Sequence, residues 1–204
     1  MSEISIIGAD VIVTMDDVRR ELGCETTIYV KDGRIAEIGP NLPLRGDILR
    51  ATGCLVTPGL INTHHHLFQS LTRAVPQAQD ALLFGWLQTL YPIWGRFTPK
   101  HMHVSAQVSL AELALSGCTL SSVHLYLFPH GARLDDTIHA AHEVGLRLHA
   151  TRGAMSIGVS KGGLPPDALV EDERTILEDS IRVIDAFHDP SDGDRKSTRL
   201  NSSH

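Results

Sequence analysis

Three consecutive histidines, His64, His65 and His66, are the residues of this sequence best suited to chemistry. In an extended strand, side chains two positions apart project to the same face, so His64 and His66 point together while His65 points away. Two imidazoles on one face make half a metal site, and neutral imidazole suits zinc. A catalytic zinc ion keeps one position for water and lowers the pKa of that water to about 7. A histidine triplet is also typical of a polar turn. The surrounding sequence must therefore distinguish a metal-binding pair from such a turn.

The segment before the triplet predicts a strand at a domain boundary. Residues 60–63 read Leu-Ile-Asn-Thr and follow Pro58-Gly59. At this point the sequence changes from short strand-like runs to alternating strand-like and helix-like segments. Upstream lie short runs rich in Val, Ile and Thr, and Asp32-Gly33 between two of them predicts a tight hairpin. We therefore expect a small β domain over residues 1–57 and a second domain over residues 58–193.

Strand-like and helix-like segments alternate after the boundary, which is typical of βαβ units, a parallel sheet and the α/β fold class. Thr98 and Pro99 predict the start of a helix that Gly117 ends. Further strands are predicted over residues 119–125 and 146–151, and further helices over residues 135–144 and 169–187. At the carboxyl end of its strand, the histidine pair would lie where barrel active sites are built.

Residues 194–204 predict no fourth strand. They contain one apolar residue in eleven, and they resemble the translated read-through of a common short-read sequencing adapter. We expect this segment to be artefactual, with a genuine disordered polar tail as the alternative. A complete (β/α)8 barrel needs about 250 residues, so we expect the natural protein to continue past Gly193.

Composition and charge argue against several functions. Lys and Arg total 18 against 24 Asp and Glu, so a net charge of -6 offers no basic face to a nucleic acid. No apolar run approaches the roughly 18 residues of a membrane span, and the sequence starts Met-Ser-Glu, without the basic start of a secretory signal. We therefore expect a cytoplasmic protein with no membrane contact. Cys24, Cys54 and Cys118 fit neither a disulfide framework nor a CxxC metal site, and we expect them to be reduced, buried thiols.

Val56 to His66 resembles the signature of the amidohydrolase superfamily, in which a proline-glycine turn and a short apolar strand lead to a His-x-His metal pair. The resemblance covers residues 4 to about 192. Within the superfamily, residues 64–74, 121–129, 151–156 and 162–167 are similar to 8-oxoguanine deaminases and hydroxyatrazine ethylaminohydrolases. The resemblance implies a partial (β/α)8 TIM-like metal-dependent hydrolase barrel, its first three βα units, preceded by part of a small β-sandwich.

The resemblance also implies a metal site and a substrate contact. His64 and His66 are the implied ligands of one zinc ion, with iron as the alternative metal. Gln69 stands where related purine deaminases place an amide that reads the purine edge, and its side chain offers both a donor and an acceptor. The alternative for Gln69 is a solvent-facing residue that opens the first helix.

The sequence allows two interpretations for each of two residues at later strand ends, Arg152 and His124. Arg152 is predicted either to donate a hydrogen bond to a substrate carbonyl or to form an ion pair with one of three acids at the start of the last helix, namely Glu171, Asp172 and Glu173. His124 is predicted either to support the metal site from behind or to be a core histidine with its polar atoms satisfied.

The implied activity is zinc-dependent hydrolytic deamination of an oxidised purine, 8-oxoguanine being converted to urate and ammonia. The alternatives are an aminohydrolase of a triazine, a pterin or another purine such as guanine, and a non-catalytic fragment or scaffold. The family's remaining ligands and its acid/base residues follow later strands, so no catalytic residue is assigned in this chain. We expect the 204 residues alone to be inactive, and the parent protein to be a homo-oligomer that binds a small heterocyclic substrate.

Overall fold

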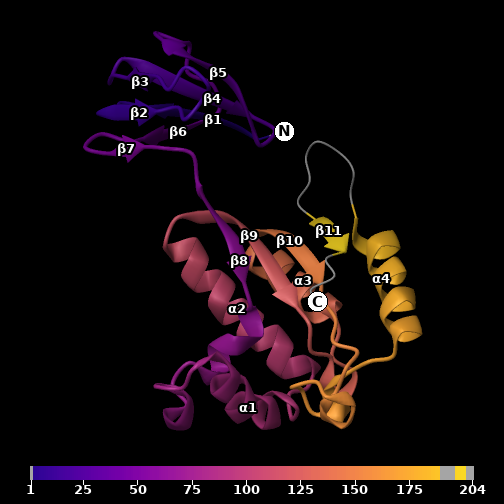
Figure 1. Ribbon diagram of the computed structural model, residues 1–204. Coiled ribbons are helices and arrows are strands. Elements are labelled where there is room, and N and C mark those ends of the chain that lie inside the picture. The colour runs from indigo at the N-terminus through magenta and orange to yellow at the C-terminus, as the bar shows by residue number, and fades with distance from the viewer. Residues whose placement is uncertain (1, 189–195, 201–204) are drawn as a thin grey trace. The chain divides into compact units, whose positions relative to one another are not determined.

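The computed structural model describes residues 2–188 and 196–200 of the chain (Figure 1). The chain divides into two compact units between Gly59 and Leu60, two residues after the boundary expected at Thr57. None of the helices in the described part is both long enough and apolar enough to span a membrane. All three cysteines are free, but Cys24 and Cys54 are exposed rather than buried, because they lie in connections between short strands and not inside them.

The first unit consists of two small sheets around a shared core. One sheet has the strand order β5-β4-β1-β6 and the other the order β3-β2-β7. Ile12 from the second sheet and Ile28 from the first are both buried in one cluster. Asp32 and Gly33 both have positive φ between the antiparallel strands β4 and β5, which confirms the predicted hairpin. The strands are β1 Glu3–Ile7, β2 Val11–Val13, β3 Glu21–Leu22, β4 Thr26–Lys31, β5 Arg34–Pro40, β6 Asp47–Arg50 and β7 Leu55–Val56.

The second unit is a parallel sheet with helical connections, as the alternating pattern predicted. Its strand order is β11-β10-β9-β8, and every neighbouring pair is parallel. The strands are β8 Leu60–His65, β9 Cys118–Leu125, β10 Arg147–Arg152 and β11 Lys196–Leu200; the helices are α1 Leu83–Trp94, α2 Pro99–Leu115, α3 Leu134–Val144 and α4 Glu173–Phe187. Short 3₁₀ helices are η1 Leu67–Thr72, η2 Pro76–Ala78, η3 Pro129–Gly131, η4 Val159–Lys161 and η5 Asp167–Leu169. This arrangement is three βα units of a barrel that begins with the histidine strand.

Local sequence explains where the connecting helices begin and end. Thr98 caps α2: its side chain accepts from the first turn, and its own N–H donates to His101 Nδ1 at 3.1 Å. Pro99 occupies the first helical position, where no N–H is needed. Gly145 ends α3 in the left-handed conformation with φ of 80°, which glycine adopts without steric cost.

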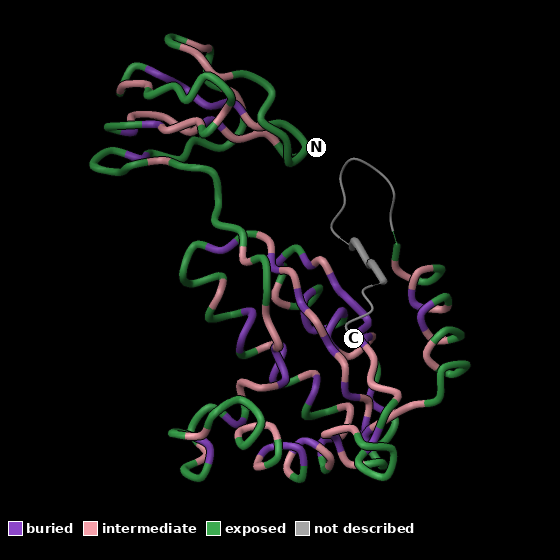
Figure 2. Tube along the Cα trace, in the orientation of Figure 1, coloured by how far each residue is buried: buried purple, intermediate pink, exposed green. Residues whose placement is uncertain are grey.

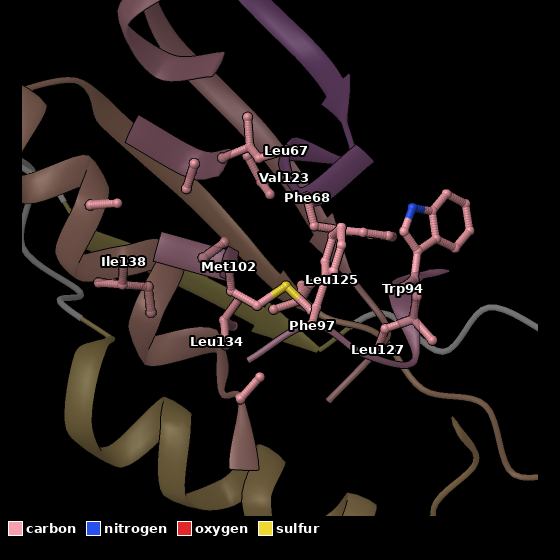
Figure 3. Close-up of a cluster of buried hydrophobic side chains, with 14 of the residues drawn as sticks. Leu67, Phe68, Trp94, Phe97, Met102, Val123, Leu125, Leu127, Leu134 and Ile138 are labelled. Atoms are coloured by element: carbon pink, nitrogen blue, oxygen red, sulfur yellow. The ribbon is translucent and has the colours of Figure 1, made fainter. Parts of the chain in front are cut away.

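The core of the second unit lies between the sheet and its helices. Burial alternates from Ser121 to the end of β9, and Val123 and Leu125 are buried; Figure 2 shows buried and half-buried stretches along the strand. Figure 3 shows these two side chains among Met102 of α2, Leu134 of α3 and the ring of Phe68. Each fully buried side chain of this size stabilises the fold by about 1.5–3 kcal/mol. Over residues 121–125, the odd-numbered residues of β9 therefore face the helices, and the even-numbered residues face the opposite side of the sheet.

The expectation of no fourth strand is wrong for residues 196–200. These residues form β11, which pairs with β10 from Leu148↔Lys196 to Arg152↔Leu200. Pairing uses backbone N–H and C=O groups, and the edge of β10 offers such groups to an extended segment of any side-chain pattern. Residues 194–195 and 201–204 of the segment expected to be artefactual lie outside the described residues.

Candidate active site

His64 and His66 converge from the end of β8. Their Nε2 atoms are 3.2 Å apart, and their rings meet at 90° with centroids 4.7 Å apart. His65 pairs in register with Val123, so its ring lies on the helix side of the sheet, where burial lowers its pKa. The alternation expected for an extended strand therefore brings the first and third rings of the triplet together.

A backbone hydrogen bond fixes the ring of His66. Its Nδ1–H donates to the carbonyl oxygen of His124 at 2.7 Å. Because a carbonyl only accepts, the proton of the neutral ring sits on Nδ1, and the lone pair of Nε2 faces His64. Burial lowers the pKa of His66, which favours the neutral form that binds metals. A partner on the second ring nitrogen is the usual way in which proteins orient a metal-ligating histidine.

The geometry of the pair fits a zinc ion. Two nitrogens that each lie 2.0–2.1 Å from a tetrahedral zinc ion are about 3.3–3.4 Å apart, and the Nε2 atoms here are separated by 3.2 Å. No group of three or more His, Cys, Asp or Glu side chains in the described part of the chain is arranged to hold a metal ion. The described residues therefore offer two nitrogen ligands.

Gln69 lies beside the histidine pair on η1. It lines an open cavity of about 350 Å³ together with all three histidines of the triplet and with Ser70, Arg73, Ser109 and Glu112. Its Nε2 donates to the hydroxyl of Tyr126 at 3.3 Å, and its backbone N–H donates to the carbonyl of His66 at 3.0 Å. The side chain is half-buried and hydrogen-bonded, unlike the solvent-facing residue of the alternative interpretation.

Tyr126 is a member of this cluster that the sequence analysis missed. Its ring centroid lies 5.2 Å from that of His66 and 5.6 Å from that of His124. Burial raises the pKa of Tyr126 to about 12, so the phenol is neutral at physiological pH. The spacing that identified the histidine pair applies here too, because Tyr126 stands two residues after His124 and so projects to the same face.

His124 supports His66 through its backbone rather than through its ring. The carbonyl of His124 accepts the hydrogen bond from His66, whereas His124 Nε2 is buried without a hydrogen-bond partner. Burial lowers the pKa of His124, which favours its uncharged form. The backbone contact with His66 agrees with the supporting interpretation, whereas the alternative of a core histidine with its polar atoms satisfied is wrong, because Nε2 has no partner.

Gly153 makes the space that the His124 ring occupies. A Cβ atom at position 153 would overlap His124 Nε2 and would lie 3.0 Å from Tyr126 Cβ. We therefore expect Gly153→Ala to lower the free energy of unfolding by about 1–3 kcal/mol, the usual cost of overpacking, and to displace both rings. Thermal unfolding measures the loss. Gly85→Ala is the control, because a Cβ there meets Ala81 only at 3.9 Å and alanine favours the helix; equal stability of both variants would contradict the steric argument.

Arg152 lies on the opposite face of the sheet from the histidine pair. It pairs in register with Leu125, a helix-side residue, whereas its neighbour Thr151 pairs with His124. Its guanidinium donates to Glu171 at 2.6 Å, to Asp179 at 3.1 Å and to the carbonyl of Gly153 at 2.8 Å. The structure therefore places Arg152 in the predicted ion pair with Glu171, adds Asp179 of α4, and gives no support to a substrate contact.

Comparison with known proteins identifies relatives of both units. A sequence profile described as "Amidohydrolase family" matches residues 55–197. An 8-oxoguanine deaminase of Pseudomonas aeruginosa is 45% identical over 180 residues, which cover 85% of this chain and 40% of that protein. A hydroxydechloroatrazine ethylaminohydrolase of Pseudomonas sp. strain ADP is 35% identical over 179 residues, covering 80% of this chain and 37% of that protein. The chain thus spans about 40% of the length of these curated relatives.

Solved structures share the fold. An atrazine chlorohydrolase from Arthrobacter aurescens TC1, crystallised in complex with zinc, matches with a TM-score of 0.91 at 30% identity, covering 98% of this chain and 46% of that chain. A guanine deaminase from C. acetobutylicum with bound guanine matches with a TM-score of 0.75 at 19% identity, covering 99% of this chain and 46% of that chain.

Proposed function

The chain belongs to the amidohydrolase family, and on that premise we propose that it supplies part of a zinc-dependent aminohydrolase that converts 8-oxoguanine to urate and ammonia. The observation that carries this proposal is the convergence of two imidazole nitrogens to 3.2 Å beside the amide of Gln69. Identity of 45% to an 8-oxoguanine deaminase supports the choice of substrate. The assignment of His64 and His66 as ligands and of Gln69 as a substrate contact is part of the proposal.

Each residue of the cluster has a separate task in the proposed reaction. His64 and His66 would hold the metal, and a bound zinc ion supplies Lewis-acid activation of water. The His124 carbonyl keeps the proton of His66 on Nδ1, so that Nε2 remains available as a ligand. Gln69 binds the edge of the heterocycle through its amide. In the net reaction, the oxygen of one water molecule replaces the amino nitrogen on the ring carbon, and the nitrogen leaves as ammonia. No acid/base residue is assigned among the described residues.

Ammonia release from a panel of heterocycles tests the proposed function. We propose that activity requires the rest of the barrel, so the assay uses a polypeptide that carries this chain together with the remaining strands. We expect kcat/KM for 8-oxoguanine to exceed that for guanine, isoxanthopterin and hydroxyatrazine by at least about tenfold, roughly the value of one well-placed hydrogen bond. Elemental analysis of the same protein distinguishes zinc from iron. Turnover of guanine or hydroxyatrazine well above that of 8-oxoguanine would overturn the choice of substrate.

A triazine, pterin or other purine aminohydrolase is the second candidate. Identity of 35% to a hydroxydechloroatrazine ethylaminohydrolase and of 34% over 184 residues to an isoxanthopterin deaminase favours it. The third candidate is a non-catalytic fragment, and an assay of ammonia release by the 204-residue chain alone tests it. We expect no activity from this chain, because two imidazoles would hold zinc only weakly. Cytoplasmic location and assembly into a homo-oligomer stay predictions from the sequence.

A further inference from the structure

The two polar atoms of the Gln69 amide differ in their contacts: Nε2 makes a hydrogen bond within the protein and Oε1 makes none with a described residue. Its Nε2 donates to the hydroxyl of Tyr126 at 3.3 Å, across 57 positions of the chain. No described residue makes a hydrogen bond to its Oε1, and Gln69 lines a cavity that it shares with all three histidines of the triplet and with Arg73 and Glu112. A planar amide held through one N–H has a fixed orientation, and it presents Oε1 as an acceptor beside its remaining N–H to a molecule in that cavity.

The Tyr126 hydroxyl has a fixed position because other aromatic rings pack around the phenol ring. His66, Phe68 and His124 surround the ring, with centroids 5.2, 5.5 and 5.6 Å from its own. The rings of His66 and Phe68 meet it at 88° and 83°, an edge-to-face arrangement that aromatic pairs prefer. A ring packed in this way keeps one orientation, so the hydroxyl at its tip stays in one place.

We propose that Tyr126 is a positioning residue that holds Gln69 with Oε1 toward the cavity, and thereby makes the site selective for heterocycles that present a ring N–H. Lactam-type rings, in which a carbonyl neighbours an N–H, belong to this class, whereas rings with a bare acceptor nitrogen at that edge do not. Tyr126 acts through Gln69 and needs no contact with the substrate. This inference rests on the proposed function and adds to it the chemical group that Gln69 recognises.

A double-mutant cycle separates this role from a structural one. Tyr126→Phe keeps the ring and removes the hydroxyl. In the active polypeptide we expect it to lower kcat/KM for 8-oxoguanine by about 5- to 30-fold, the range of one hydrogen bond to a positioned group, mostly through KM. In a Gln69→Leu background the same substitution should change kcat/KM less than twofold, because no amide remains to be positioned. Metal content should equal that of the wild type throughout.

Tyr91→Phe is the matched control. The Tyr91 hydroxyl contacts Met155 Sδ at 3.7 Å and makes no hydrogen bond to Gln69, so we expect less than a twofold change. A second comparison uses 8-oxoguanine against derivatives methylated at each ring nitrogen, and the preference of the wild type for the N–H form should shrink in Tyr126→Phe. Gln69→Asn, which keeps the amide but is one methylene too short for the phenol, should lose the same preference.

The outcomes distinguish the two proposals. A wild type that releases ammonia from no heterocycle overturns the proposed function. An active wild type overturns the positioning role alone if Tyr126→Phe has wild-type kinetics, if its loss is equally large with Gln69→Leu, or if Gln69→Asn keeps the full preference for the N–H form. Coupling between the two positions with unchanged metal content supports the role.

Discussion

Replacement of His66 by alanine is expected to abolish both zinc retention and turnover. Four-ligand zinc sites bind with about 10–16 kcal/mol, so one ligand contributes roughly 3 kcal/mol, and its loss weakens binding by at least about 100-fold. Turnover should fall further, by more than about 10³-fold, because the activation of water is lost with the metal. Metal content after dialysis, together with the rate of ammonia release, measures both effects.

His65→Ala is the control that tests the geometry of the strand. The ring of His65 lies on the helix side of the sheet, in register with Val123, so this variant should retain its zinc. His64→Ala should behave like His66→Ala, since the two Nε2 atoms face each other. Retention of wild-type zinc by His66→Ala, or loss of zinc from His65→Ala alone, would show that the ligands are not the alternate pair.

Arg152→Met is expected to cause the largest loss of stability, about 3–5 kcal/mol in the free energy of unfolding. The guanidinium is buried between two carboxylates and stacks on the Phe128 ring, 4.2 Å from its centroid. Methionine fills part of the volume but leaves Glu171, about one-fifth exposed, without a cation, whereas Asp179 keeps its bond from Arg182 at 2.8 Å. Breaking a buried ion pair on one side costs this much because the remaining charge is poorly solvated. Urea denaturation measures the change.

An exposed ion pair on the same helix provides the comparison. Arg174 and Glu178 are 2.7 Å apart and largely open to solvent. Such pairs contribute about 0–1 kcal/mol, so Arg174→Met should shift the urea midpoint only slightly. A loss of less than about 1 kcal/mol in the free energy of unfolding for Arg152→Met would contradict this prediction. It would show that the ion pairs of Arg152 with Glu171 and Asp179 do not hold β10 to α4.

Features that depend on neighbouring residues could be predicted from the sequence. The convergence of His64 and His66 follows from strand alternation, and the limits of α2 and α3 follow from Thr98 with Pro99 and from Gly145. In each case the physical cause lies within a few residues of its effect, where spacing alone fixes the geometry.

Features that depend on contacts across the chain could be predicted only in part: the sequence offered Glu171 as a partner of Arg152, but not the other long-range bonds. The bond from Gln69 to Tyr126 joins η1 to the end of β9, and the bond from Arg152 to Asp179 joins β10 to the second turn of α4. The face of Arg152 follows from register with Leu125, and no single strand shows its register with a neighbour. β11 was missed because backbone pairing needs no side-chain pattern.

The position of β8 at the edge of the described sheet links the proposed binding of a metal ion to the pairing of a further strand. Among the described strands, β8 is hydrogen-bonded to β9 alone, and Leu60 and Ile61 at its start are each 61% exposed. If His64 and His66 hold a metal ion as proposed, a strand that pairs with the open side of β8 would restrict the two imidazoles, and the bound ion would in turn restrict β8. By thermodynamic linkage, the two events favour each other by equal amounts of free energy, so metal loading and closure of the sheet should proceed as one cooperative step.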